Sequence, residues 1–291
     1  MLNAWLAYKR LKIQGRYQWL ASPRTTRRSS TSKTGVAVAR LSSFTVGRFS
    51  SDSWDDQAMA IADAGMRAIA YDRRGFGGSS QARSGHDYDT LSDDLANVLE
   101  QCKARDATLV GFSMGGGEVA RYLSRHSGKG VVSAALVSSV VPFMLKTDDN
   151  PNGMEASKFE AMTAGTKEDR AKFFTSFFKD FFGVGPISHL TSDARVQAAW
   201  TVAMQAGLKP TLACAKAFAT TDFRPELTSF RCRTLIIHGT ADKTVPIDAA
   251  GRPAAKAIAN STLEEYDGEP HDLFVTSKDR LTVDRLDFLR H

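Results

Sequence analysis

The chain has few cysteines, and their placement excludes several kinds of site. Only three occur in 291 residues, at Cys102, Cys214 and Cys232. The number is odd, the three are far apart, and no two form the C-x-x-C pair of a metal or redox motif. The sequence therefore offers no disulfide framework and no thiol-based metal centre. This cysteine usage is typical of a reducing compartment, and we expect a cytoplasmic protein.

Long hydrophobic runs and nucleotide-binding signatures are also missing. No run of 18 or more apolar residues occurs, so the sequence predicts no transmembrane helix. The apolar start at residues 1–6 is too short for the h-region of a secretory signal. Residues 75–79 lack the third glycine of G-x-G-x-x-G, and residues 111–117 lack the Lys-Ser or Lys-Thr pair of a P-loop. We expect neither a membrane anchor nor a nucleotide-binding loop.

Acidic residues are absent from the first 51 positions, which hold ten Lys and Arg residues. The whole chain has a formal net charge of +6, so the remaining 240 residues are net negative. The basic isoelectric point is therefore a property of the N-terminal segment, and it does not indicate a nucleic-acid-binding face. Residues 1–50 differ from the rest of the chain as an atypical basic segment.

After that segment, patterns typical of strands and helices alternate along the chain. Apolar runs predict strands over 66–71, 107–110, 131–137 and 234–239, and a strand-like pattern predicts another over 261–266. Helical patterns occur over 56–64, 90–101 and 117–126. Thr90 and Asp93 have the spacing of a capping box at the start of the second helix. Strands that alternate with helices form a mostly parallel sheet covered on both faces, so the fold class is α/β.

The alternation stops between residues 142 and 230, where the sequence turns helical and aromatic. Six phenylalanines recur there at helical spacing: Phe173, Phe174, Phe177, Phe178, Phe181 and Phe182. This pattern predicts a helical cap over 142–230, inserted into a core of residues 51–141 and 231–291. Some of these rings, with Trp200, Met204 and Met144, are candidates to line an acyl pocket, although packing in the core explains each of them more simply.

One short motif indicates the chemistry. Residues 111–115 read Gly-Phe-Ser-Met-Gly between an apolar strand pattern and a helical pattern. This is the strand–turn–helix context of a G-x-S-x-G nucleophile elbow, in which a sharp turn holds the serine hydroxyl clear of the sheet. The alternative is a glycine-rich turn with an incidental serine. The elbow interpretation makes Ser113 a nucleophile.

A serine hydroxyl is a weak nucleophile at neutral pH, so Ser113 needs a general base and a group that orients the base. Of the six histidines, His271 follows a late expected strand, whereas the others fall at helix or strand ends, in polar loops or at the last residue. Asp242, in the loop after the preceding expected strand, is the candidate orienting acid. Its rivals are Asp222, which comes early in the chain, and Asp272, which is adjacent to the base and unsuited to orient it.

Further segments extend this pattern from residue 53 to the C-terminus. They read Trp-Asp-Asp-Gln at 54–57, Tyr-Asp-Arg-Arg-Gly-Phe-Gly at 71–77, Gly-Gly-Gly-Glu at 115–118, Asn-Pro-Asn-Gly at 150–153, Thr-Asp-Phe at 221–223, and His-Gly through Pro at 238–246. With the elbow, these segments resemble the cofactor-free, non-heme haloperoxidase (chloroperoxidase) and arylesterase family of the α/β-hydrolase superfamily. The resemblance implies an α/β-hydrolase fold, a catalytic triad of Ser113, His271 and Asp242, and no metal or organic cofactor.

The resemblance also implies an oxyanion hole, which needs two N–H donors for the oxygen that becomes charged in the transition state. One donor is the backbone N–H of Met114, the residue after the nucleophile. The other comes from a loop usually written His-Gly-Trp-Pro, but residues 42–49, where this loop belongs, read Ser-Ser-Phe-Thr-Val-Gly-Arg-Phe. The second donor is therefore missing from the chain as written.

A shifted reading frame accounts for this departure. Codons that can encode residues 42–49, read one nucleotide earlier, permit Ile-Leu-His-Gly-Trp-Pro-Leu, and the same shift over residues 21–35 permits a sequence that resembles the first two strands of the family. We therefore hypothesise that the chain is translated out of frame up to about Phe49 and in frame again by Ser51, which disrupts the first strands. An organellar transit peptide and a genuine basic arm are the alternatives.

Together these features predict a serine hydrolase of small carboxylic esters that works through an acyl-enzyme, and the resemblance implies that hydrogen peroxide can replace water. A lactonase or another C–O hydrolase is the alternative within this class, and a catalytically impaired protein is the alternative outside it. The expected partners are a small ester or carboxylic acid and hydrogen peroxide, with no nucleic acid and no membrane. The sequence leaves a homo-oligomer open.

Overall fold

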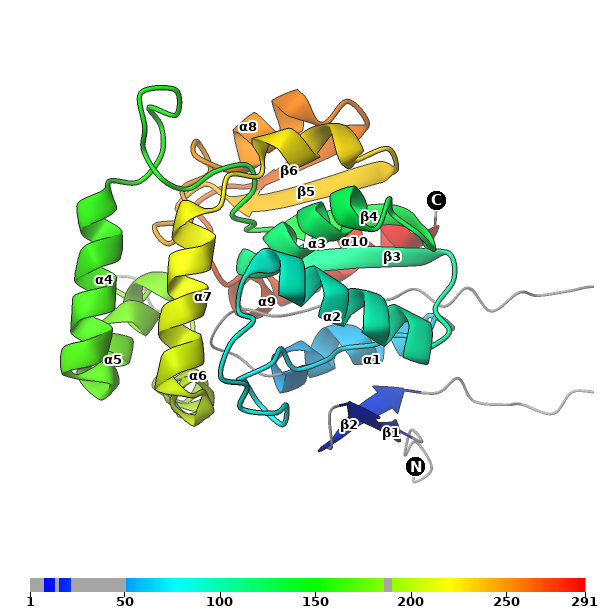
Figure 1. Cartoon of the computed structure of the whole chain (residues 1–291), viewed down its shortest axis with the longest axis horizontal. Coiled ribbons are helices and arrows are strands. Elements are labelled where there is room, and N and C mark those ends of the chain that lie inside the picture. Colours follow the sequence, from blue (N-terminus) through cyan, green and yellow to red (C-terminus); the bar gives the residue numbers. More distant parts are fainter. Residues whose placement is uncertain (1–7, 14–15, 22–50, 186–189, 291) are drawn as a thin grey trace, which may run out of the picture.

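The computed structural model describes residues 8–13, 16–21, 51–185 and 190–290 (Figure 1). Its larger sheet consists of parallel strands in the order β3 (Ala107–Phe112), β4 (Val131–Val137), β5 (Arg233–Gly239) and β6 (Ser261–Tyr266). The sequence predicts all four, and β4 and β6 have the predicted bounds. Every residue of β3 is buried, which is typical of a parallel strand covered on both faces.

Helices before, between and after these strands cover the sheet. They are α1 (Asp55–Asp63), which follows the short 3-10 helix η1 (Ser51–Trp54), and α2 (Tyr88–Gln101), α3 (Met114–Arg125), α8 (Gly251–Ala257), α9 (Leu273–Thr276) and α10 (Lys278–Arg290). Across the described ranges, none of the helices combines the length and the apolar character that crossing a bilayer requires.

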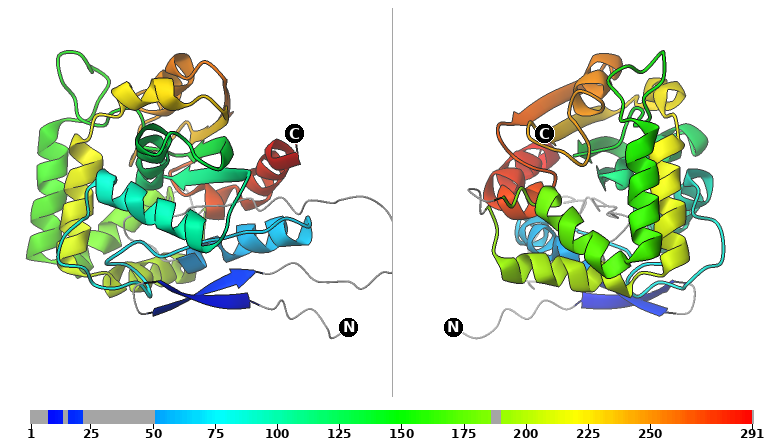
Figure 2. Two further views of the ribbon diagram at one scale, coloured as in Figure 1. Left: turned by 45° about the vertical axis from the view of Figure 1, so that its right-hand side comes forward. Right: turned by 90° about the vertical axis from the view of Figure 1, so that its left-hand side faces the viewer.

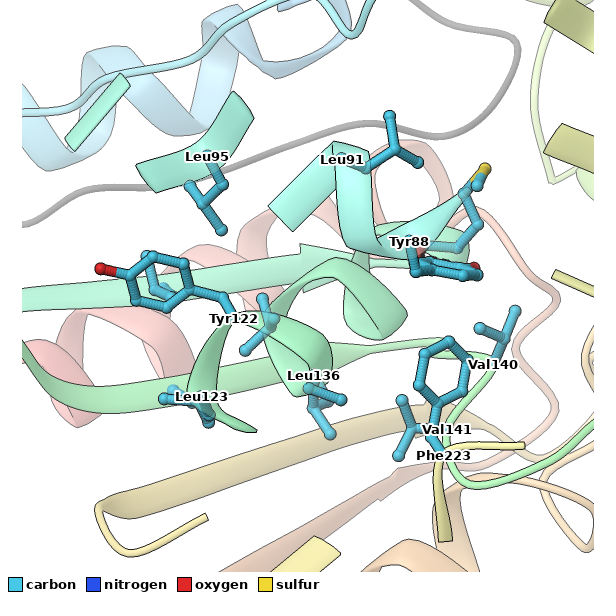
Figure 3. Close-up of a cluster of buried hydrophobic side chains, with 14 of the residues drawn as sticks. Tyr88, Leu91, Leu95, Tyr122, Leu123, Leu136, Val140, Val141 and Phe223 are labelled. Carbon is cyan, nitrogen blue, oxygen red and sulfur yellow. Dashed lines mark hydrogen bonds between the residues drawn. The ribbon is translucent and has the colours of Figure 1, made fainter. Parts of the chain in front are cut away.

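Side chains of the sheet enter two separate hydrophobic clusters. Leu136 of β4 belongs to a cluster with residues of α2, α3 and α8, whereas the next residue, Val137, belongs to a cluster with residues of α9 and α10. Because successive residues of a strand point to opposite faces, the two clusters mark the two covered faces of the sheet. Figure 3 shows part of the first cluster, which includes Leu91 of α2, Leu123 of α3 and Leu136 of β4.

Helix α2 begins earlier than the sequence predicts. Its N-cap is Asp87, whose carboxylate accepts a hydrogen bond of 2.9 Å from the backbone N–H of Thr90. The predicted capping box at Thr90 and Asp93 is therefore wrong, and Asp93 pairs instead with Arg125. The buried ring of Tyr88, in the first turn, extends the helix beyond the apolar pattern on which the prediction relied.

Residues 66–71, predicted as a strand, do not form one. Arg67 and Ile69 take part only in single bridges, although Ile69 and Tyr71 are buried. A strand requires continuous hydrogen bonding to a neighbouring strand along its length, and single bridges do not provide it. The burial of Ile69 and Tyr71 accounts for the apolar pattern of this segment.

The N-terminal segment contributes one described element. Strands β1 (Tyr8–Ile13) and β2 (Arg16–Ala21) pair as an antiparallel hairpin, which is a sheet separate from β3–β6. Residues 42–49, where the sequence leads us to expect the second oxyanion donor, lie outside the described residues. The hypothesis of a shifted frame therefore stays a prediction.

Between β4 and β5 the structure describes four α-helices. They are α4 (Ala156–Glu168), α5 (Arg170–Phe181), α6 (Asp193–Gln205) and α7 (Leu208–Thr220), followed by the 3-10 helix η2 (Arg224–Ser229). Figures 1 and 2 show α4 to α7 standing together beside the sheet. Phe174, Phe178 and Phe181 of α5 are buried in the same cluster as Phe112 of β3, so this face of α5 packs on the sheet. The division of the chain into a core and a cap stays a prediction.

Candidate active site

The serine of the elbow stands alone between a strand and a helix. Strand β3 ends at Phe112 and α3 begins at Met114, so Ser113 makes the whole turn. Its backbone has φ 53° and ψ −124°, a region that residues with a side chain rarely adopt and that is associated with functional strain. The backbone N–H of Ser113 donates to the carbonyl of Val137 at 2.9 Å, which ties the turn to the end of β4.

Glycine is required at the start of this turn. A Cβ atom at Gly111 would lie 2.6 Å from the carbonyl oxygen of Gly115 and equally close to backbone atoms of Gly116. Real Cβ contacts are essentially never that short, and the obstacle is backbone that cannot rotate away. The first glycine of the G-x-S-x-G motif is therefore a packing requirement of the β3–α3 turn.

Ser113, His271 and Asp242 lie together, although 158 residues separate the serine from the histidine. The Nε2 atom of His271 is 3.0 Å from the Ser113 hydroxyl, and its Nδ1 atom is 2.6 Å from Oδ2 of Asp242. All three side chains are buried. With Nδ1–H donating to the carboxylate, Nε2 keeps its lone pair for the serine proton, which is the arrangement of a general base.

Asp242 is held as a carboxylate by the loop around it. Its Oδ1 atom accepts hydrogen bonds from the backbone N–H groups of Thr244 and Val245, at 2.9 and 2.8 Å. Burial acts to raise the pKa of Asp242, but the charge of His271 and hydrogen bonds from His238 and His271 outweigh it and lower the pKa to about 2. Asp242 is therefore ionised at neutral pH.

His238 is a neighbour of this site that the sequence reading placed only at a strand end. Its Nε2 atom lies 2.8 Å from the carbonyl of Val245 and 3.4 Å from Oδ2 of Asp242. Its side chain is fully buried. The separation of four residues between His238 and Asp242, across the end of β5, is the sequence signal that could have indicated this contact.

The imidazole of His271 is held by contacts from several elements. The hydroxyl of Ser138 donates to the backbone carbonyl of His271 at 2.9 Å. The rings of Phe112 and Phe181 lie 5.0 and 4.8 Å from the imidazole centroid. These contacts come from β3, α5 and the end of β4, so the orientation of His271 depends on elements far apart in the sequence.

The rival acids have other partners. Asp222 forms an ion pair with Arg224. Asp272 caps α9 by accepting from the backbone N–H of Phe274 at 3.1 Å, and burial raises its pKa to about 7. Of the other histidines, His126 pairs with Asp93, while His189 and His291 lie outside the described residues.

Met114 is the first residue of α3, directly after Ser113. The first N–H groups of a helix have no intrahelical partner, so the N–H of Met114 is of the kind that can donate to an anion beside the serine. The Met114 side chain is buried, and its carbonyl accepts from the Tyr88 hydroxyl at 3.2 Å.

A small cavity of about 40 Å³ opens beside the serine. Ser113 and Met114 line one part of it, and Met162, Phe177 and Phe218 of the surrounding helices line another. One water molecule needs about 10–15 Å³ measured in this way, so the cavity suits a group of a few heavy atoms.

Some of the residues predicted to line an acyl pocket line this cavity, and others do not. Of the six phenylalanines, Phe177 and Phe181 line the cavity, whereas Phe174 and Phe178 are buried in the second cluster. The other candidates pack in the hydrophobic clusters and do not line the cavity beside Ser113: these are Trp200, Met204 and Met144. Phe112 and Asp272 line a larger cavity of about 210 Å³, which Ser113 does not line.

Two of the sequence segments on which the resemblance depends meet inside the protein. The buried carboxylate of Glu118, on α3, accepts from the Tyr71 hydroxyl at 2.9 Å and from Nε of Arg73 at 2.6 Å. A second nitrogen of Arg73 completes an ion pair with Glu118. The Gly-Gly-Gly-Glu and Asp-Arg-Arg-Gly segments thus hold the helix behind the nucleophile in place.

In the part of the chain that the structure describes, no three His, Cys, Asp or Glu residues are grouped so as to hold a metal ion.

The parallel sheet, the elbow and the Ser–His–Asp arrangement define the class of the α/β hydrolases. Residues 45–278 match the family described as alpha/beta hydrolase fold, and the chain belongs to this family. Non-heme chloroperoxidase CPO-A1 of Kitasatospora aureofaciens is 40% identical over 240 residues, which are 82% of this chain and 87% of that protein.

Two other proteins narrow the group. The bifunctional esterase/perhydrolase DCH of Acinetobacter calcoaceticus is 36% identical over 83% of this chain and 88% of its own length. The crystal structure of a bromoperoxidase from Bacillus anthracis superimposes with a TM-score of 0.87 at 36% identity, covering 98% of this chain and all of that one. The protein is therefore an α/β-hydrolase enzyme of the non-heme haloperoxidase, esterase and perhydrolase group.

Proposed function

We propose that this enzyme hydrolyses small carboxylic esters through an acyl-enzyme on Ser113. The observation that supports this most directly is the buried chain of contacts from Ser113 through His271 to Asp242, at 3.0 and 2.6 Å, beside a small apolar cavity. A general base within hydrogen-bond reach of a serine hydroxyl is the arrangement that activates it for attack on a carbonyl carbon.

Acylation uses each of these residues. Ser113 attacks the ester carbonyl while His271 takes the hydroxyl proton at Nε2, and ionised Asp242 stabilises the imidazolium that forms. The N–H of Met114 donates to the oxyanion of the tetrahedral intermediate. His271 then gives its proton to the leaving alcohol, and the acyl group remains on Ser113 in the cavity.

The second half-reaction accepts either of two nucleophiles. Water, deprotonated by His271, releases the carboxylic acid and restores Ser113. Hydrogen peroxide in the same position releases a peracid, which oxidises halide outside the site. The names of the relatives, chloroperoxidase and esterase/perhydrolase, support this second route for the present chain.

The second oxyanion donor belongs to this proposal as well. In the hypothesis of a shifted frame, the His-Gly-Trp-Pro loop at residues 42–49 supplies it, and α4 to α7 form the cap over the acyl cavity. Loss of one oxyanion donor typically costs about 10²–10³ in kcat, so the chain as written is a slow enzyme.

Sequencing the gene from the codon of Gln18 to that of Ser51 tests this part. A frame that reads His-Gly-Trp-Pro, with one base gained or lost near Phe49, supports the hypothesis. If that frame encodes no sequence that resembles the family, the remaining explanations of the N-terminal segment are a transit peptide and a genuine basic arm. A cytoplasmic location remains a prediction from the cysteine pattern.

Hydrolysis of p-nitrophenyl acetate tests the main proposal. We expect the purified protein to release p-nitrophenol and the Ser113→Ala variant to lose this activity. Ser92→Ala is the matched control, because Ser92 is also buried and its hydroxyl donates to the carbonyl of Asp89 within α2. A folded sample whose activity is the same with and without Ser113 would contradict the proposal.

A lactonase is the second candidate, because the triad serves any carboxylic ester and the helices over the cavity select the substrate. Bromination that requires both peroxide and acetate would favour the perhydrolase, and ring opening of a lactone with no such bromination would favour the lactonase. The mass of the protein in solution, measured by light scattering, answers whether it is a homo-oligomer.

A further inference from the structure

The cavity beside Ser113 has sulfur atoms in its wall. Three sulfur-containing residues line it, each from a different helix: Met114 from α3, Met162 from α4 and Cys214 from α7. Met114 and Cys214 are 2% and 1% exposed, and Met162 is half-buried. We call these three residues the sulfur wall. Two of them are buried and one is half-buried, and all three line the space in which the acyl group is held.

The proposed function places an oxidant in this space. A peracid formed on Ser113 is released into a cavity of about 40 Å³, so it meets the sulfur wall before it reaches solvent. Thioethers are oxidised to sulfoxides and thiols to sulfenic acids by such electrophilic oxygen, and thioethers react without losing a proton. The remaining wall, including Phe177 and Phe218, offers no group of comparable reactivity.

We propose that the sulfur wall is a site of oxidation by the enzyme's own peracid, an inference that rests on the perhydrolase part of the proposed function. The O–O bond of the peracid breaks as its outer oxygen forms a bond to the sulfur of Met162 or Met114. The sulfur is oxidised by two electrons to a sulfoxide, and the peracid is reduced to the carboxylic acid, which retains its proton. At Cys214 the same transfer gives a sulfenic acid.

The modification changes the cavity. A sulfoxide replaces an apolar thioether by a polar group that demands hydrogen bonds. In an apolar space of a few heavy atoms this disfavours the acyl group of the substrate. Perhydrolysis is therefore self-limiting, and activity falls with the number of turnovers instead of with the time spent in peroxide.

The chain contains internal controls. Met59 on α1 is 45% exposed and does not line the cavity. Cys232 is half-buried and lines a different depression. An oxidant in bulk solvent attacks Met59 before buried sulfur, whereas an oxidant formed at Ser113 attacks the sulfur wall first. The order of oxidation therefore reports where the oxidant arises.

The experiment is peptide mass spectrometry of the whole protein after reaction with hydrogen peroxide and ethyl acetate. We expect Met114 and Met162 to gain one oxygen at least about threefold faster than Met59. Peroxide without ester, or the Ser113→Ala variant in the full mixture, should oxidise Met59 first. Two results would overturn the inference. One is oxidation of Met59 ahead of Met114 and Met162 in the full mixture, and the other is oxidation of Met114 and Met162 in Ser113→Ala to the same extent as in the wild type.

Two further measurements separate this inference from the proposed function. Bromination of a diketone in a parallel sample reports the formation of peracid. If no bromination occurs, the perhydrolase proposal and this inference both fail. If bromination occurs and the sulfur wall is unmodified, only this inference fails. Met162→Leu should complete more peroxide-dependent turnovers before inactivation than the wild type, while Met59→Leu should match the wild type. Equal lifetimes for all three proteins, with peracid formed, would show that the sulfur wall does not limit turnover.

Discussion

At the scale of the residue, two buried aspartates near the site have opposite ionisation. Asp242 accepts two backbone N–H groups and faces His271, which lowers its pKa to about 2 against the effect of burial. Asp272 is next to His271 in the chain but accepts only hydrogen bonds within its cap, and burial raises its pKa to about 7. The partners, and not the residue type, decide which carboxyl can stabilise an imidazolium.

Asp242→Asn should lower kcat for p-nitrophenyl acetate by about 10⁴, because the amide holds the wrong tautomer of His271. The KM should change little, since Asp242 does not line the cavity. Steady-state kinetics at pH 7 measures both. Asp222→Asn is the matched control. A comparable loss of kcat in that variant would show that the assignment of the orienting role to Asp242 is wrong.

The ionisation of Asp242 also bears on acid stability. Its folded pKa, about 2, lies below the ordinary value of an unfolded aspartate, so its stabilisation is present above about pH 4 and is lost as the pH falls toward 2. It therefore contributes nothing to changes in stability between pH 5 and pH 8.

Asp272 should make the protein less stable as the pH rises. Its folded pKa, about 7, lies above that of the unfolded chain, so unfolding releases a proton between about pH 4 and pH 7 and the folded state is penalised there. Asp272→Asn should gain roughly 2 kcal/mol relative to the wild type on going from pH 5 to pH 8.

Urea denaturation at the two pH values measures this difference. The asparagine oxygen can still accept from the N–H of Phe274, so the cap of α9 is kept. Asp279→Asn, at an exposed position, should show the same difference from the wild type at both pH values. A pH-independent effect at Asp272 would contradict the assignment of its pKa.

At the scale of the element, the β3–turn–α3 unit places Ser113. The strand ends and the helix begins on either side of Ser113, so nothing but a strained backbone separates the sheet from the first N–H groups of α3. The close approach of Gly111 to Gly115 and Gly116 is what makes so sharp a turn possible.

Gly111→Ala should therefore disturb both stability and activity. The new methyl group meets backbone at 2.6 Å, and overpacking of this kind costs about 1–3 kcal/mol. Displacement of Ser113 should lower kcat as well. Thermal unfolding and ester hydrolysis measure the two effects, and Gly185→Ala, where no atom lies within 4 Å, should leave both unchanged. A wild-type melting temperature for Gly111→Ala would refute the packing argument.

At the scale of the whole molecule, a buried ion pair joins distant segments. Glu118 of α3 contacts Tyr71 and Arg73, more than 40 residues earlier, and each of these side chains is at most 3% exposed. Taking both charges out of water is costly, and their mutual attraction compensates for that cost. Removal of only one partner therefore strongly destabilises the protein.

Glu118→Gln should lower the free energy of unfolding by about 3–5 kcal/mol, because it removes the carboxylate charge that pairs with the buried guanidinium of Arg73. The double variant Glu118→Leu with Arg73→Met should recover most of the loss, since it removes both charges and keeps the volume. Denaturation at neutral pH compares the three proteins. A double variant as unstable as Glu118→Gln would show that the charge is not the cause.

The sequence predicted the strands β3 to β6 well, because β3, β4 and β5 contain apolar runs and β6 has a strand-like pattern before a turn. It predicted the α2 cap wrongly, since Asp87 and Thr90 both suit an N-cap and only the burial of Tyr88 decides between them. It also predicted a strand over 66–71, where burial without continuous pairing gives the same apolar pattern. Local patterns report burial reliably and hydrogen-bond partners less so.

The sequence by itself determined the α/β class, the elbow at Ser113 and the small set of residues from which its partners come, because strand periodicity and turn chemistry are local properties of the chain. Only the tertiary structure decided that Asp242, and not Asp222 or Asp272, meets His271, and that His238 adjoins them. It also decided which phenylalanines and which sulfur atoms face the serine. These contacts join residues far apart in the sequence, and the packing of helices on the sheet sets them.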